Sequence, residues 1–196
     1  MELNIHRPTP VNIELALDPN RYFISKTDTK GIITSVNEYF MKIAGYTREE
    51  LIGKPHSIIR HPDMPKIIYK ILWDKIQSGQ NIAAICKNLA KDGKYYWVVT
   101  DFEINKDPNT GEIIEYTAYR RAPSRETIET VIPIYKELIE AEKIGGMEAS
   151  EKHLQRILKN MGMSYDDFIN NELKKSGLAD AFKGAMKSAW GKFFGK

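Results

Sequence analysis

The first part of the chain alternates between strand-like and helix-like segments. Residues 21–27 and 32–36 are rich in aromatic and β-branched residues that alternate with polar ones on either side of a glycine-ended turn, which predicts a β-hairpin. Asn37 begins a short helical pattern. Thr47 begins a second one, where Glu50 can complete a capping box. Two brief helices are therefore expected after the hairpin.

A longer helix and three strands follow. Apolar residues recur with helical spacing over residues 66–77, and a Ser-Gly pair at 78–79 ends the pattern. Residues 81–89, 94–104 and 113–120 have strand character, with an Asp-Gly turn between the first two. The order of elements predicts an α+β fold, in which a five-stranded antiparallel sheet and helices on one face enclose a space.

The rest of the chain has a helical pattern. An apolar stripe from Ile128 to Ile139 predicts a first helix, in which Pro133 is a point of bending or restart. A second predicted helix ends at Gly162 and a third begins at Ser164. Residues 178–193 predict a fourth, with apolar residues on one face and lysines elsewhere.

These patterns divide the chain into an N-terminal cap (1–19), an α+β domain (20–122) and an all-helical C-terminal extension (123–196). The 42% hydrophobic content of the 196 residues is enough for a core. A net charge of +3 from 29 basic and 26 acidic residues gives no sign of nucleic-acid binding. There is no secretion signal, no apolar run near the roughly 18 residues of a membrane span, and a single cysteine, so we expect a cytoplasmic protein.

The segment 57–65, SIIRHPDMP, holds the most distinctive candidate chemistry. Its two prolines fix φ and remove backbone donors, which predicts a rigid loop. Arg60 offers a planar set of donors suited to phosphate, His61 a ring that stacks or hydrogen-bonds, and Asp63 an acceptor suited to a hydroxyl. The three suit a nucleotide cofactor, and a surface turn with Asp63 as a helix cap is the alternative.

Three stretches carry a resemblance to a known family. Residues 28–65, the string LWDKIQSG at 72–79 and the string KNLAKDGKYYWV at 87–98 resemble the PAS domains of the aerotaxis and energy-taxis (Aer/CetB) type. The resemblance covers about residues 20–122, and RHPDMP is its most specific part. It implies a PAS fold, a non-covalently bound FAD whose redox state reports on respiration, and a signalling partner of the chemotaxis system.

The resemblance also implies a flavin pocket. Arg60, His61 and Asp63 fall on the motif that is implicated in holding FAD in this family. Asn37 falls on the family's asparagine after the second strand. Trp73 on the long helix and Asn88 on a later strand lie in surroundings that match the family.

Two departures from the family pattern keep other interpretations open. Residues 81–84 lack the tryptophan and glycine that are common there, and Leu89 stands where arginine is common, so a cofactor-free PAS interaction module is one alternative. A heme-binding gas sensor is another, with His56 or His61 as the iron ligand because the long helix and the later strands have no histidine. Cys86 is interpreted as a buried structural thiol rather than as a flavin-reactive one.

The chain has no nucleophile motif, phosphate loop, kinase segment or cyclase segment, so we expect signalling by binding and not an enzyme. The resemblance implies a membrane-bound methyl-accepting chemotaxis-type transducer as partner, with a homodimer formed through the PAS domain or the helical extension. In the last predicted helix, Phe182, Trp190 and Phe193 lie opposite lysines. That face suits peripheral membrane contact, a partner helix or an intramolecular contact.

Overall fold

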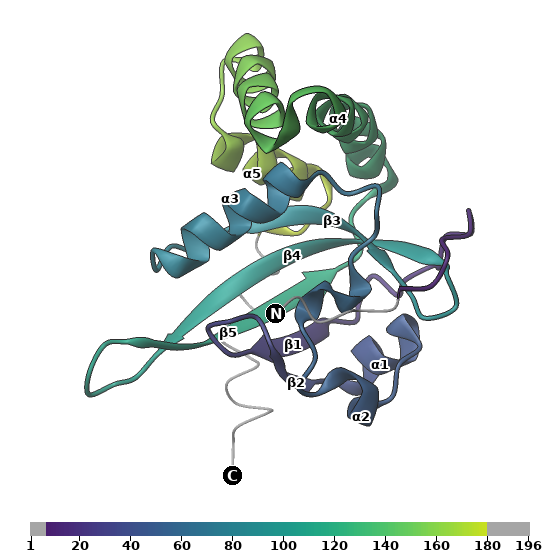
Figure 1. Ribbon diagram of the computed structural model, residues 1–196, viewed down its shortest axis with the longest axis vertical. Helices are drawn as coiled ribbons and strands as arrows, with labels where there is room; N and C mark the ends of the chain where they lie inside the picture. The colour runs from purple at the N-terminus through teal and green to yellow at the C-terminus, as the bar shows by residue number, and fades with distance from the viewer. Residues whose placement is uncertain (1–6, 180–196) are drawn as a thin grey trace.

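The computed structural model describes residues 7–179. In these residues a five-stranded sheet carries short helices on one side and a helical extension at one edge (Figure 1). The strands are β1 (Phe23–Thr27), β2 (Ile33–Val36), β3 (Ala83–Leu89), β4 (Tyr95–Lys106) and β5 (Ile113–Arg121). The helices are α1 (Glu38–Ala44), α2 (Arg48–Leu51), the 3₁₀ helix η1 (His56–Ile59), α3 (Lys66–Gln77), α4 (Arg125–Met161) and α5 (Tyr165–Lys175).

The sheet is antiparallel throughout, in the order β2-β1-β5-β4-β3. Phe23 of β1 lies opposite Arg120 of β5, which in turn lies opposite Thr100 of β4. Because side chains alternate along a strand, this register aligns one face of the three central strands. The predicted hairpin and five-stranded α+β fold are confirmed.

The short helices begin where the sequence predicts. The side chain of Asn37 accepts a hydrogen bond from the backbone N–H of Phe40 and so caps α1. Thr47 and Glu50 form the predicted capping box at α2. Gly45 ends α1 with φ 74°, a left-handed conformation that a glycine adopts without strain.

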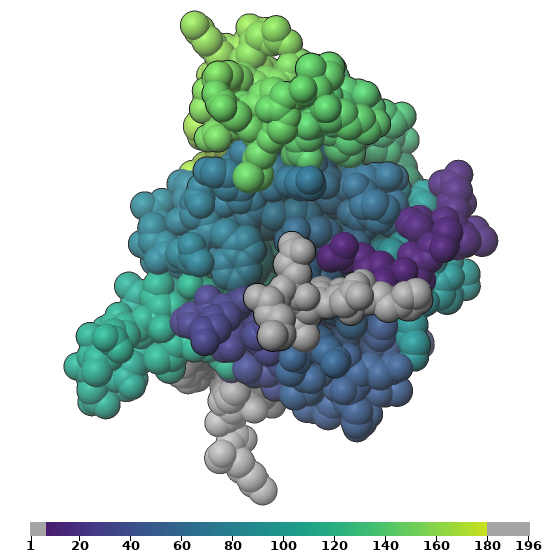
Figure 2. All heavy atoms as spheres, viewed as in Figure 1, coloured from purple at the N-terminus to yellow at the C-terminus, as the bar shows by residue number. Residues whose placement is uncertain are grey.

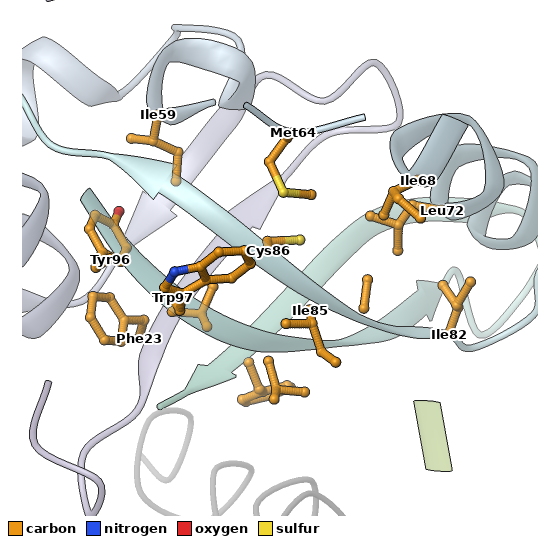
Figure 3. Close-up of a cluster of buried hydrophobic side chains, with 14 of the residues drawn as sticks. Phe23, Ile59, Met64, Ile68, Leu72, Ile82, Ile85, Cys86, Tyr96 and Trp97 are labelled. Carbon is orange, nitrogen blue, oxygen red and sulfur yellow. The ribbon is translucent and has the colours of Figure 1, made fainter. Parts of the chain in front are cut away.

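Part of the core lies where the loop before α3, helix α3 and strand β3 meet. Met64 from the loop before α3, Ile68 and Leu72 from α3, and Ile85 and Cys86 from β3 are all buried (Figure 3). The Sδ atom of Met64 accepts a hydrogen bond from the backbone N–H of Lys87, 3.2 Å away, which ties that loop to the sheet.

The helical extension forms a lobe beside α3 (Figure 2). Helix α4 continues through Pro133 and breaks instead at Gly145 and Gly146, whose backbone angles are not helical. Pro133 and Glu129, whose carbonyl loses its helical hydrogen bond, are both exposed to solvent, so water can satisfy that carbonyl. The fourth predicted helix falls almost entirely outside the described residues.

No helix within residues 7–179 is long and apolar enough to cross a membrane.

The outer face of the sheet, opposite α3, carries a desolvated acid. Asp101 of β4 is partly buried, and this burial raises the pKa of its carboxyl from 3.8 to about 6, with a smaller contribution from the nearby Glu103 carboxylate. The backbone N–H of Phe102 opposes the shift. An acid whose pKa is higher in the folded state destabilises the protein once it is ionised.

We predict that Asp101→Asn changes the pH dependence of stability. In the wild type, the contribution of Asp101 to the free energy of unfolding falls as the pH rises from about 4 to above 6, because folded Asp101 holds its proton longer than unfolded Asp101 does. The variant lacks this loss and is more stable than the wild type by about 2–3 kcal/mol at pH 8, with the gap closing near pH 4. Urea unfolding across this pH range measures the difference, and a pH-independent gap would contradict the assignment.

Candidate functional site

A cavity of about 380 Å³ lies between the inner face of the sheet, η1 and α3. Strand residues form one wall and helix residues the other. Its lining includes Ser25, Thr27, Lys30, Gly31, His56, Ile59, Arg60, Tyr69, Leu72, Trp73, Ile76, Cys86, Asn88, Thr100, Phe102, Tyr116, Ala118 and Arg120. The volume is in the range typical of small-molecule sites.

The charge of the lining is one-sided. Three of the lining residues are cations, Lys30, Arg60 and Arg120, and no aspartate or glutamate is among the described residues that line the cavity. A cavity with cationic walls favours a ligand that carries negative charge or several acceptor atoms.

Arg120 supplies the most deeply buried of these charges. Its side chain is 3% exposed, and burial lowers the pKa of its guanidinium to about 10. Nη1 donates to Ser25 Oγ (2.9 Å) and Nη2 donates to His56 Nε2 (2.9 Å). Neither partner is an anion, so the cation is solvated by dipoles alone, an arrangement that leaves it electrostatically uncompensated.

His56 is held neutral by this arrangement. Because an arginine only donates, Nε2 of His56 is the acceptor and the ring proton lies on Nδ1. Ser25 Oγ, 3.1 Å from Nε2, donates to the same nitrogen while it accepts from Arg120. Desolvation, then the positive charges of Arg120 and Arg60, lower the pKa of His56 well below its ordinary value.

Arg60 packs over an aromatic ring of the cavity wall. Its guanidinium carbon is 3.6 Å from the ring centroid of Tyr69 on α3, a cation–π contact that also orients the donors. Within the described structure, the Nε of Arg60 and the hydroxyl of Tyr69 are buried without a hydrogen-bond partner. Two unmet polar groups at one cavity wall are suited to a ligand that supplies acceptors and donors.

Asn88 and Trp73 also line the cavity, as the sequence predicts. Asn88 on β3 is 5% exposed, and its backbone forms a bridge with that of Arg60, which fixes the loop to the sheet edge. Trp73 on α3 meets Tyr116 edge-on with centroids 6.1 Å apart. Gly31 leaves room for its ring, since a Cβ on that glycine would lie 2.8 Å from two ring carbons.

The other three predicted site residues do not line the cavity. Both functional groups of the Asn37 amide are engaged in fixing β1 to α1: Nδ2 donates to the Tyr22 carbonyl, and Oδ1 accepts from the N–H groups of Ile24 and Phe40. Asn37 thus fixes β1 to α1 and is not among the residues that line the cavity.

His61 and Asp63 contact the neighbouring strands: His61 lies against Tyr95 of β4, and Asp63 pairs with Lys87 of the edge strand β3. His61 is buried, its Nδ1 accepts from the backbone N–H of Asp63, and its ring meets Tyr95 edge-on. The exposed carboxylate of Asp63 pairs with Lys87 Nζ at 2.8 Å and does not cap α3. Of the RHPDMP motif, only Arg60 lines the cavity.

Sequence reasoning missed Ser25, Tyr69 and Arg120 as residues that line the cavity, and it considered His56 only as a heme ligand. For Arg120 a signal existed: it shares a face with Tyr116 and Ala118 by alternation along β5. The pairing of Arg120 with Ser25 and His56 depends on the register of β1 with β5, which no local pattern gives.

The PAS fold family profile matches residues 33–118. Residues 33–118 form a PAS domain. Over 132 residues, 66% of this chain, the sequence is 38% identical to the aerotaxis receptor of Escherichia coli K12, of which it covers 25%. It is 27% identical over 47% of the chain to the biofilm dispersion protein BdlA of Pseudomonas aeruginosa, covering 22% of it. The PAS region thus matches about a quarter or less of the length of these relatives.

Solved structures agree on the fold. The light state of the blue-light photoreceptor Aureochrome1 LOV superimposes with a TM-score of 0.52 and 17% identity, over 57% of this chain and 88% of that one. A light-oxygen-voltage domain studied with a flavin analogue superimposes with a TM-score of 0.51 and 16% identity, over 59% of this chain and 86% of that one. At such identities the likeness shows the fold alone. The match of residues 33–118 to the PAS fold family confirms the PAS domain that the sequence predicts.

We predict that Gly31→Ala disturbs the cavity wall. A Cβ there meets the Trp73 ring at 2.8 Å and is held at φ 79°, whereas Gly111 has a similar φ of 74° and no atom within 4 Å of the position that a Cβ would take. Gly31→Ala should therefore cost about 1–3 kcal/mol more in the free energy of unfolding than Gly111→Ala. Thermal unfolding, with tryptophan emission as the probe, compares the two. Equal losses would show that the Gly31–Trp73 contact is not tight.

Proposed function

We propose that this chain is a redox or energy sensor in which the PAS cavity binds FAD non-covalently and the helical extension passes the signal to a partner. The observation that carries the proposal is the cavity itself, which has three cations and no carboxylate among the described residues of its lining and two buried polar groups without partners. The 38% identity to an aerotaxis receptor supports a redox role.

The residues present fit a flavin nucleotide. Its diphosphate is an anion that suits Arg60 and Lys30, and its ring system has acceptors and donors along one edge. Trp73, Tyr69 and Phe102 give the cavity aromatic surfaces for a planar ring. A flavin supplies redox chemistry that the side chains of the cavity lack.

Within the cavity, we assign roles to residues of this chain. Asn88 and Arg60 lie on opposite sides of a backbone bridge and would hold the ligand at the edge of β3. Arg120 places a positive charge at the centre of the inner face, where it would favour any increase of negative charge on the ligand. Ser25 Oγ and His56 Nε2 both accept hydrogen bonds from Arg120. Either atom can instead accept a hydrogen bond from a donor on the ligand.

Helix α3 is the proposed relay. One of its faces carries Tyr69 and Trp73 into the cavity, and its first turn is capped from the extension. Pro65 at its N-cap has no side-chain acceptor, and Glu142 Oε1 of α4 accepts from the N–H of Ile67 at 3.0 Å. A shift of α3 on ligand binding or reduction would therefore move a contact of α4 directly.

The other cofactor hypotheses find less support. A heme ligated by His56 through Nε2 would have to displace the hydrogen bonds from Arg120 and Ser25, and His61 does not line the cavity. In a cofactor-free module the cavity would hold no ligand, and the buried Nε of Arg60 would have no hydrogen-bond partner.

For the partner we propose a membrane-bound transducer of the chemotaxis type, with signalling by binding rather than catalysis and with a homodimer as the assembly. The extension offers a contact surface at its break, where Ile144 is 89% and Met147 41% exposed. Exposed apolar side chains next to a helix break are suited to protein contacts.

We predict that Arg60→Met weakens FAD binding while Arg48→Met, the same change on α2 outside the cavity, does not. Loss of a charged hydrogen-bonding partner should raise the Kd by about tenfold to a hundredfold. Titration of the flavin-free protein with FAD, followed by quenching of tryptophan emission, gives both values. If Arg60→Met bound FAD as tightly as the wild type does, the cavity would not be the FAD site. If the wild type bound no FAD, FAD would not be the ligand.

We predict that Glu142→Ala loosens α3. Loss of the cap should lower the free energy of unfolding by about 1 kcal/mol. Glu140→Ala, which removes only an ion pair with exposed Lys143, should cost less than about 0.5 kcal/mol. Hydrogen exchange at the Ile67 amide should speed up in the first variant only. Equal exchange in both variants would mean that α4 does not hold α3.

A further inference from the structure

The break in α4 divides this helix into two arms that lie against each other. Residues 125–144 form the first arm and residues 147–161 the second, and the two run in different directions (Figure 1). His153 Nε2 of the second arm lies 2.8 Å from Glu137 Oε2 of the first, a contact between residues 16 positions apart. The chain therefore turns back on itself at the break.

Two glycines make this turn, and we call them the hinge. Gly145 has φ −135°, and Gly146 has φ 68° with ψ −164°, a conformation that is open to glycine and strained for a residue with a Cβ. Both glycines can also take helical angles, because glycine within a helix lowers its stability without breaking it. A straight α4 of 37 residues would be about 55 Å long.

Two large apolar side chains flank the hinge and are exposed. Ile144 is 89% exposed, the highest value for a large apolar residue in the described part of the chain, and Met147 is 41% exposed. In a straight helix their spacing of three places them on one face, whereas in the bent helix they lie on different arms. The bent chain thus leaves uncovered two side chains that a straight α4 presents as one apolar patch.

The segment after the hinge packs on the rest of the chain through contacts that a second copy can supply equally well. Asp166 of α5 pairs with Lys75 of α3 at 3.1 Å, and Ser176 Oγ accepts from the backbone N–H of Ser124 at 3.0 Å. Helix α5 also packs on β3. The hinge itself is loosely surrounded, since no atom lies within 4 Å of the position that a Cβ on Gly146 would take.

Resting on the homodimer proposed above, we propose that the dimer forms by exchange of the segment after the hinge. In each copy α4 straightens, and residues 147–179 pack on α3, β3 and the first arm of the other copy, with the contacts that they make within one chain. The two straight helices cross near the hinge, where Ile144 and Met147 of both copies meet. This contact is new in the dimer and covers apolar surface that is exposed in the monomer.

The hinge lies close to the contact between the sensor domain and the extension. Glu142, which accepts from the N–H of Ile67 in the first turn of α3, precedes Gly145 by three residues. A shift of α3 on ligand binding therefore acts on the balance between bent and straight α4. The fraction of exchanged dimer is then the output of the sensor.

A cross-link between the two arms of α4 tests the exchange. Glu137→Cys with His153→Cys, in the full chain with Cys86→Ala, is treated with a short bis-maleimide after size-exclusion chromatography and run on a denaturing gel. In a straight α4 the two positions of one chain are about 24 Å apart, so they meet only between copies. We expect a product of twice the chain mass from the dimer fraction and a within-chain product from the monomer fraction.

The matched control for this cross-link is Lys70→Cys with Asp74→Cys on α3. The two side chains pair at 2.6 Å one turn apart on the same helix, so their cross-link stays within one chain in every arrangement. Any product of twice the chain mass in this control measures random collision between chains, and it is subtracted.

Hinge substitutions shift the balance between monomer and dimer. Gly145→Ala with Gly146→Ala strains the bent backbone and suits a straight helix, so we expect the dissociation constant of the dimer to fall at least about tenfold. Gly162→Ala is the control, because Gly162 has a similar φ of 66° and ends α4 outside the hinge. It should leave the constant unchanged in analytical ultracentrifugation.

Substitutions in the apolar patch act in the opposite direction. Ile144→Glu with Met147→Glu places charges where the two straight helices cross, and we expect the dissociation constant to rise at least about tenfold. Met161→Glu, at a methionine that is 43% exposed at the end of α4, should leave it unchanged.

Two results would overturn the exchange, and they separate it from the proposed function. A dimer fraction that gives only the within-chain product is held by another surface, which leaves the proposed homodimer intact. A chain that stays monomeric even with both hinge glycines replaced contradicts the exchange and the homodimer together. The FAD titration of Arg60→Met tests the cavity independently of either result.

Discussion

The positive charge of Arg120 on the inner face of the sheet is the constraint on which the site depends. Burying a guanidinium without a carboxylate is costly, and here Ser25 and His56 supply the compensating dipoles. The same contacts keep His56 neutral and fix its tautomer. Because the remaining lining adds Arg60 and Lys30 but no acid among the described residues, the cavity is complementary to an anionic ligand.

The loop between η1 and α3 connects this charge to the rest of the molecule. Arg60 stacks on Tyr69 of α3 while its backbone pairs with Asn88 of β3, so the loop holds one helix against one strand. Helix α3 in turn receives Glu142 at its first turn and pairs Lys75 with Asp166 of α5. Ligand space and helical extension therefore share a single rigid element, which gives the proposed sensor a short route for its signal.

The local elements could be predicted from the sequence because their signals are local. Asn37, Thr47 and Gly45 mark helix ends through hydrogen bonds within a few residues, and strand alternation gives the sheet. The site was only partly predictable. Arg60 lines the cavity, but His61 and Asp63 turn away because a proline between them reverses the chain and Lys87 attracts the carboxylate, a contact between segments far apart in sequence.

The roles of Arg120 and His56 depend on strand register and on the path of η1, which periodicity does not encode. The break in α4 shows the same limit. Pro133 is the stronger local signal, yet the helix tolerates it on a solvent-facing side and breaks at two glycines.

The visible absorption spectrum of the freshly purified full chain tests the central claim most directly. The account predicts the two absorption bands of an oxidised flavin, lost on reduction with dithionite and recovered in air. A protein that is colourless and stays colourless after incubation with FAD, or one that shows the Soret band of a heme, would contradict it.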